Sequence, residues 1–174
     1  SQLSSIEEGT FSMCSSVKNI TIPGSVTSIG VGAFYECSNL ASINIPEGVT
    51  SIEDYTFHGC CSLTSINMPV DIKSIGRYAF SYCDSLTNIT LPKSTTSIGE
   101  YAFHSCSSLA SIVIPESITE IGRSAFSGCS SLESFTIPNG ITAIERETFK
   151  ETCEEGRVPA TQFLAIRKED EKLV

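Results

Sequence analysis

The side chains most able to do chemistry in this sequence are its eight cysteines, six of which recur at every 23rd residue. Cysteines can form disulfides or bind zinc, but the short Cys-x-x-Cys spacing typical of zinc sites is absent. If the chain coils with one turn per repeat, successive cysteines lie about 4.8 Å apart, which also permits disulfides. Because cysteine is commonly a small buried hydrophobic residue, we expect free thiols in a core. The six are Cys14, Cys37, Cys60, Cys83, Cys106 and Cys129.

Two histidines and two further cysteines are the remaining candidates for catalysis or modification. His58 and His104 occupy one repeat position two repeats apart, so about 10 Å would separate them, too far for a shared metal ion. Neither has a nucleophile at a distinctive spacing, and we expect both to be ordinary surface residues. The sequence therefore predicts a protein that is not an enzyme, with no catalytic residue, metal site or cofactor. Cys61 and Cys153 lie outside the cysteine column and are the expected exposed thiols.

The same 23-residue interval governs the phenylalanines and indicates a repeat protein. A fixed period of roughly 20 to 50 residues is typical of solenoids, in which each repeat adds one turn, or rung, to a coil. Rings at one position per rung would stack into a buried aromatic spine. The residues in this column are Phe11, Phe34, Phe57, Phe80, Phe103, Phe126 and Phe149.

Each repeat also contains a strand pattern, of which Leu40-x-x-Ile43-x-Ile45 is one example. This is the L-x-x-L-x-L signature of a leucine-rich repeat. Alternation places Ile43 and Ile45 inside and the residue between them outside. Pro46 has no N–H to extend the ladder, so the strand stops there. We expect parallel strands of about three to five residues, one per rung.

Two other parts of the repeat have their own patterns. Residues 49–52 are apolar at the first and fourth positions and mostly β-branched, which predicts a second short extended segment on the opposite side of the coil. Residues 99–106 are apolar at helical spacing, which favours a single helical turn. The predicted fold is an α/β leucine-rich repeat solenoid, with short parallel β-strands stacked into a right-handed coil, mostly β and loop, and with single helical turns.

The repeat pattern fails after Phe149, which divides the chain into two parts. Residues 1–152 are predicted to form the solenoid, which starts in the middle of a repeat. Residues 153–174 are a non-repeat segment, in which Thr161 could cap a helix. We expect this helix to cover the last rung of the solenoid. A frayed charged tail and a segment that docks on another molecule are the alternatives.

The formal net charge of −9 argues against nucleic acid or an anionic membrane as partner, because both require a basic patch. No apolar run approaches the roughly 18 residues of a membrane span, so no membrane insertion is expected. The first residues have neither the basic nor the apolar region of a signal peptide. Because the chain starts within a repeat, we expect it to be a piece of a longer solenoid.

Two surfaces are candidates for binding a protein partner. The first, the strand face, is formed by the outward residue of each strand, and a merely solvated sheet is its alternative. The second is a stripe of Tyr55, Tyr78 and Tyr101, whose rings would lie about 5 Å apart on successive rungs. These rings could instead shield the phenylalanine spine. The strand face comprises Thr21, Asn44, Asn67, Thr90, Val113 and Thr136.

The run Ser-Ile-Gly-x-x-Ala-Phe-x-x-Cys-Ser-Ser-Leu-x-Ser-Ile-x-Ile-Pro resembles the 23-residue leucine-rich repeat of BspA-like proteins. The resemblance extends from residue 3 to about residue 152. It implies a protein-binding module of a cell-surface adhesin, at the cell surface or secreted, that recognises host matrix or cell-surface proteins. It transfers no binding residue, because no such motif is general to the family.

An intracellular structural scaffold is the alternative function. In that case the chain would be cytoplasmic and its partners would be neighbours in a larger assembly. Reduced thiols on six rungs favour this setting, because disulfides form in oxidising compartments. The resemblance to surface proteins favours the adhesin.

Overall fold

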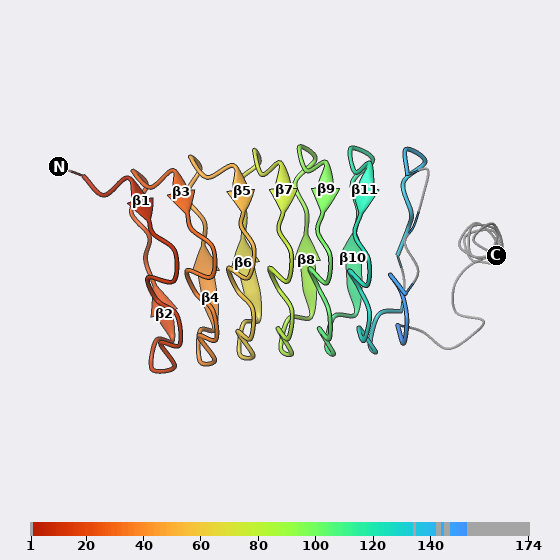
Figure 1. The fold of residues 1–174 in the computed structure, drawn as a ribbon, viewed down its shortest axis with the longest axis horizontal. Coiled ribbons are helices and arrows are strands. Elements are labelled where there is room, and N and C mark those ends of the chain that lie inside the picture. The colour runs from red at the N-terminus through yellow and green to blue at the C-terminus, as the bar shows by residue number, and fades with distance from the viewer. Residues whose placement is uncertain (1, 134, 142–143, 145–146, 153–174) are drawn as a thin grey trace.

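The computed structural model describes residues 2–133, 135–141, 144 and 147–152, which form a coil with two columns of short strands on opposite sides (Figure 1). One column contains β2 (Asn19–Ile20), β4 (Ser42–Asn44), β6 (Ser65–Asn67), β8 (Asn88–Thr90) and β10 (Ser111–Val113). The other contains β1 (Ser5–Ile6), β3 (Ser28–Ile29), β5 (Ser51–Ile52), β7 (Ser74–Ile75), β9 (Ser97–Ile98) and β11 (Glu120–Ile121). The predicted second extended segment is therefore confirmed. Residues 153–174 lie outside the described residues, so the capping helix and the boundary at residue 152 stay predictions.

Within each column the strands pair in parallel with their equivalents one repeat away, as in Ile43 opposite Ile66 and Ile52 opposite Ile75, except between β3 and β5 and between β6 and β8. In the column formed by the Leu-x-x-Ile-x-Ile pattern, β4, β6, β8 and β10 have three residues, the lower end of the predicted range, and β2 has two; the strands of the other column have two. In the first column, a turn follows β4 almost at once and is closed by a hydrogen bond from the Val49 N–H to the Pro46 carbonyl; the same turn follows β2, β8 and β10. The right-handed sense of the coil stays a prediction.

The segment expected to be a single helical turn is a series of linked turns, and that expectation is wrong. Between Gly99 and Cys106 the backbone amides alternate between two kinds of partner. His104 donates to the Tyr101 carbonyl in its own rung, whereas Phe103 donates to the Ala125 carbonyl in the next rung, at 2.8 Å. In a helix every amide would bond four residues back. The described residues contain no helix.

The phenylalanine spine is present as predicted. Successive rings stack with centroids 5.3 or 5.4 Å apart along the whole column from Phe11 to Phe149. The interior rings, such as Phe57 and Phe80, have no solvent exposure. Each ring therefore contacts the rings above and below it, and the spine joins the rungs into one continuous core.

The cysteine column lines this core as free thiols, as expected. Each buried thiol donates a hydrogen bond to the phenylalanine carbonyl of the preceding rung, as in Cys83 to Phe57 at 3.2 Å and Cys106 to Phe80 at 3.0 Å. Burial raises the pKa of both thiols well above the ordinary value, which makes them poor nucleophiles. Cys61 is exposed, as expected, and Cys153 lies outside the described residues.

Gly99 marks a position where successive rungs approach each other closely. A Cβ atom there would lie 2.7 Å from the Arg77 nitrogen and 2.8 Å from the Gly76 carbonyl carbon. The requirement is for space, because the φ angle of Gly99 is not in the left-handed region. Glu53 takes this position in another rung, so the backbone can shift to admit a side chain at some cost.

Replacing Phe80 with alanine should remove two ring contacts and leave a cavity in the spine. We expect the free energy of unfolding to fall by about 3–5 kcal/mol, measured by urea denaturation. Phe80→Leu should lose clearly less. A loss below about 1 kcal/mol for Phe80→Ala would show that the spine does not stabilise the coil.

Replacing Gly99 with alanine should push adjacent rungs apart. We expect a loss of about 1–3 kcal/mol in the free energy of unfolding. Gly24→Ala is the matched control, because a Cβ atom at Gly24 has no neighbour within 4 Å. This control should be neutral or slightly stabilising. Equal losses for the two variants would contradict the proposed role of close rung packing.

Candidate functional site

All five tyrosines and both histidines of the chain gather on one side of the coil, in the linked turns between the two strand columns. We call this group the aromatic surface. None of its members is buried, and Tyr82 is the most open at 44% exposure. Its members are Tyr35, Tyr55, His58, Tyr78, Tyr82, Tyr101 and His104.

The predicted stripe of Tyr55, Tyr78 and Tyr101 forms the centre of this surface. The ring centroids of Tyr55 and Tyr78 lie 5.0 Å apart, and those of Tyr78 and Tyr101 lie 4.7 Å apart and nearly parallel. Within the described residues, the rings that these tyrosines contact belong to other tyrosines and to the two histidines. The stripe therefore forms an aromatic layer of its own, separate from the phenylalanine stack.

His58, expected to be a surface histidine, is partly exposed and connects the stripe to the other tyrosines. Its ring stacks on Tyr35 at 5.0 Å and meets Tyr82 edge-on at 5.5 Å. Its Nδ1 atom is buried and has no hydrogen-bond partner among the described residues. Burial lowers the pKa of His58, although the Glu36 carboxylate acts in the opposite direction. The ring is therefore neutral at pH 7.

Sequence analysis missed Tyr35, Tyr82, His58 and His104 as parts of one surface. A usable signal was present, because Tyr35, His58 and His104 fall in a single column of the 23-residue alignment. Their contact with the stripe is lateral, between different columns. The repeat period alone does not give that distance.

Four of these tyrosines have a left-handed backbone. The φ angles are 58° at Tyr55, 53° at Tyr78, 60° at Tyr82 and 55° at Tyr101. Glycine adopts this conformation without steric cost, and Gly32 does so at the stripe position of the preceding rung. Bulky residues in this region are strained, and such strain tends to be kept where a side chain has a function.

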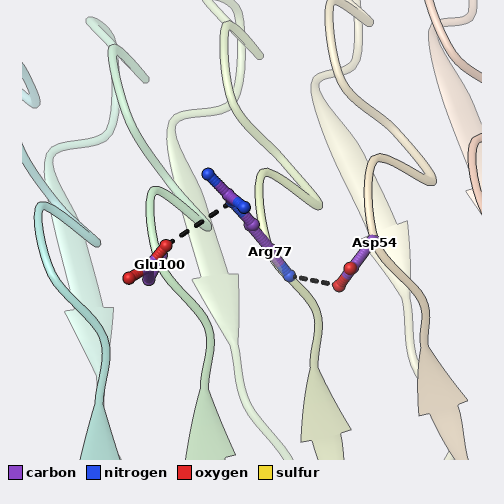
Figure 2. A network of polar contacts seen from close by, with 3 residues as sticks. All are labelled: Asp54, Arg77 and Glu100. Carbon is purple, nitrogen blue, oxygen red and sulfur yellow. Dashed lines mark hydrogen bonds and ion pairs between the residues drawn. The ribbon is translucent and has the colours of Figure 1, made fainter.

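The guanidinium group of Arg77 lies over one ring of the aromatic surface, that of Tyr78. Its guanidinium carbon is 5.2 Å from the centroid of the Tyr78 ring, a cation–π distance. Figure 2 shows its polar neighbours: the backbone N–H of Arg77 donates to the Asp54 carboxylate at 2.7 Å, and the side-chain Nε lies 3.5 Å from the Glu100 carboxylate. The ion pair is half-exposed and contributes little stability.

The strand face is present as an exposed column, but it is not continuous. All six of its residues are exposed, and Val113 has 68% exposure. The sheet is interrupted between β6 and β8, which do not pair. A cavity of about 350 Å³ lies at this interruption, between Asn67 and Thr90. A second cavity, of about 460 Å³, lies beside Val113 and Leu91.

Two further observations concern the described residues as a whole. They contain no group of three or more histidine, cysteine, aspartate or glutamate side chains placed to hold a metal ion. They also contain no helix with the length and apolar character needed to cross a membrane.

The repeat itself identifies the family. A model of the BspA type leucine rich repeat region matches residues 1–64 and 50–158, with six copies. The chain belongs to the BspA-type leucine-rich repeat family. No match was found among curated proteins.

Solved structures of other bacterial leucine-rich repeat proteins are similar to this BspA-type chain. A Bacteroides ovatus leucine-rich repeat protein is 42% identical over 80% of this chain, with a TM-score of 0.77. The T. pallidum leucine-rich repeat protein is 30% identical over 95% of this chain and 76% of its own length, with a TM-score of 0.81. A leucine-rich cell surface protein from Faecalibacterium prausnitzii is 32% identical over 77% of this chain, with a TM-score of 0.59. This chain spans 36% of the Bacteroides protein and 42% of the Faecalibacterium protein.

The lowered pKa of His58 should make stability depend on pH. Because the pKa of His58 in the folded protein lies below its ordinary value of 6.5, the unfolded chain binds the proton more readily, and the free energy of unfolding should fall as pH decreases through about 6.5. Thermal melts between about pH 7.5 and 5.5 would measure this loss. His58→Phe keeps a ring against Tyr35 and should lose less stability over the same interval. Parallel curves for the two proteins would contradict the assignment.

Proposed function

We propose that this BspA-type chain is a non-enzymatic protein-recognition module of a cell-surface adhesin, and that it binds its partner through the aromatic surface. The observation that carries the proposal is the concentration of every tyrosine and histidine on one side of the coil, in ring contact and accessible to solvent. Tyrosine is enriched at protein interfaces and in their energetic hot spots, because a rigid ring with a polar tip buries large area at low entropic cost.

The backbone supports this choice of surface. Tyr55, Tyr78 and Tyr101 occupy a position that the fold fills with Gly9 and Gly32 in earlier rungs and with Ser124 in a later one. A large ring is therefore not needed there for the coil to form. Three strained tyrosines on consecutive rungs are better explained by contact with a partner than by packing.

The proposed location is the cell surface, or a secreted protein. It is supported by the Faecalibacterium structure, a leucine-rich cell surface protein that is 32% identical to this chain. The proposed partners are host matrix or cell-surface proteins. An intracellular scaffold remains the alternative, and the buried thiols fit either setting because they are shielded within the core.

The strand face is the second candidate surface. It is favoured by the crevice between β6 and β8 and by the exposed side chain of Val113. Short polar side chains dominate it, and they offer less contact area than the tyrosines.

Binding to a panel of purified matrix and host cell-surface proteins, measured by surface plasmon resonance, tests the function. Tyr78→Ser removes a central ring, and Ser124 at φ 54° shows that serine fits the backbone of this column. We expect affinity for a confirmed partner to fall by about thirtyfold, as for a hot-spot residue. Asn67→Arg, the matched change on the strand face, should alter it by less than about twofold.

The opposite pattern would assign binding to the strand face. No partner in the panel, together with capture by an intracellular assembly and no antibody labelling of intact cells, would support the scaffold and contradict the adhesin.

A further inference from the structure

We propose that the aromatic surface recognises a basic segment of the partner protein, and that an arginine side chain of this segment enters a pocket beside Tyr82. The inference rests on the proposed function and names the chemistry of the partner. It comes from the shape, the charge and the ring geometry of one edge of the surface.

The pocket lies where the aromatic surface meets the next turn. It has a volume of about 610 Å³. His58 and Tyr82 give it aromatic walls, Met13 adds an apolar wall with 66% exposure, and two carboxylates, Glu36 and Asp84, complete the lining. Aromatic rings together with carboxylates are the combination that binds guanidinium groups, through ring stacking and charge-assisted hydrogen bonds.

Neither carboxylate of the pocket is neutralised by a basic side chain among the described residues. Glu100 pairs with Arg77 and Glu147 pairs with Arg123. By contrast, neither Glu36 nor Asp84 forms an ion pair with a described residue, and no lysine or arginine lines the pocket. A side-chain hydrogen bond with Glu36 raises the pKa of Tyr35, and burial, with a smaller contribution from the negative charge of Asp84, raises the pKa of Cys61.

The occupant must therefore be a cation. The chain carries a net charge of −9, so phosphate, nucleic acid or an acidic segment would be repelled. Arg77 on Tyr78 provides an internal example of a guanidinium group bound to a ring of this same surface. Arginine is preferred over lysine because its planar group can stack on a ring and pair with a carboxylate at once.

Tyr82 and Glu36 also share the left-handed backbone of their column, with φ angles of 60° and 53°. Gly59 and Gly128 fill the same position in other rungs. The pocket thus presents a ring and a carboxylate at positions where the fold accepts glycine, as does the tyrosine stripe.

The test uses fluorescence anisotropy with the whole chain and a labelled Gly-Ser peptide carrying three arginines. The matched peptide replaces each arginine with citrulline, which has nearly the same shape without the charge. We expect the arginine peptide to bind at least about tenfold more tightly than the citrulline peptide, and more weakly as salt is added.

Two variants locate the binding. The double variant Glu36→Gln, Asp84→Asn should weaken arginine-peptide binding by about tenfold. The control Glu47→Gln, Asp71→Asn removes two exposed carboxylates that do not line this pocket and should change binding by less than about twofold. Tyr82→Ser should also weaken binding, and Ser105 at φ 56° shows that serine fits this column. Unchanged melting temperatures would show that the variants fold.

The proposal is overturned if the arginine peptide does not bind, if the citrulline peptide binds equally well, or if both double variants weaken binding to the same extent. The last result would indicate nonspecific attraction to an acidic chain. The function and this inference can fail separately. A partner from the binding panel that is sensitive to Tyr78→Ser but not to Glu36→Gln, Asp84→Asn would support the aromatic surface and overturn the arginine pocket.

Discussion

The structure depends on the stacking of each rung on its neighbour in a 23-residue register, through three kinds of contact that repeat on every rung. The phenylalanine rings stack at 5.3 to 5.4 Å, and alternate amides of the linked turns donate to the next rung. The cysteine thiols add hydrogen bonds between the same rungs, as from Cys83 to Phe57. Because all three contacts repeat with one period, any residue type that recurs in the sequence becomes a column in space. Core and surface are therefore built by the same rule.

The 23-residue register also explains how a regular coil presents different side chains on different rungs. The stripe position holds Gly32, then Tyr55, Tyr78 and Tyr101, then Ser124, so an unchanged backbone presents rings on three rungs. The left-handed conformation makes each tyrosine costly, and the stacking of the rings offsets part of that strain. The pocket beside Tyr82 follows the same logic, with Glu36 and Gly59 at the equivalent positions. The backbone is the same on each rung, so the chemical character of the surface depends on which side chains occupy the equivalent positions.

Sequence spacing predicted the columns of residues correctly but not the backbone of the turns. The apolar spacing at Gly99, Ala102, Phe103 and Cys106 matched a helical turn, because linked turns place side chains three residues apart in a similar way. Their amides, however, alternate between the same rung and the next, as His104 and Phe103 do. That choice depends on a neighbouring rung that local spacing does not describe.

The period, the phenylalanine spine, the buried thiols and the inward and outward faces of the strands were determined by the sequence, because each follows from spacing along one chain direction. The tertiary structure decided which columns lie side by side. The contact of His58 with Tyr35 and Tyr82, at 5.0 and 5.5 Å, depends on how tightly the turns fold across the coil. So does the position of Glu36 and Asp84 around one pocket. Lateral distances depend on backbone φ angles such as those of the tyrosines, and a repeat period carries no information about these angles.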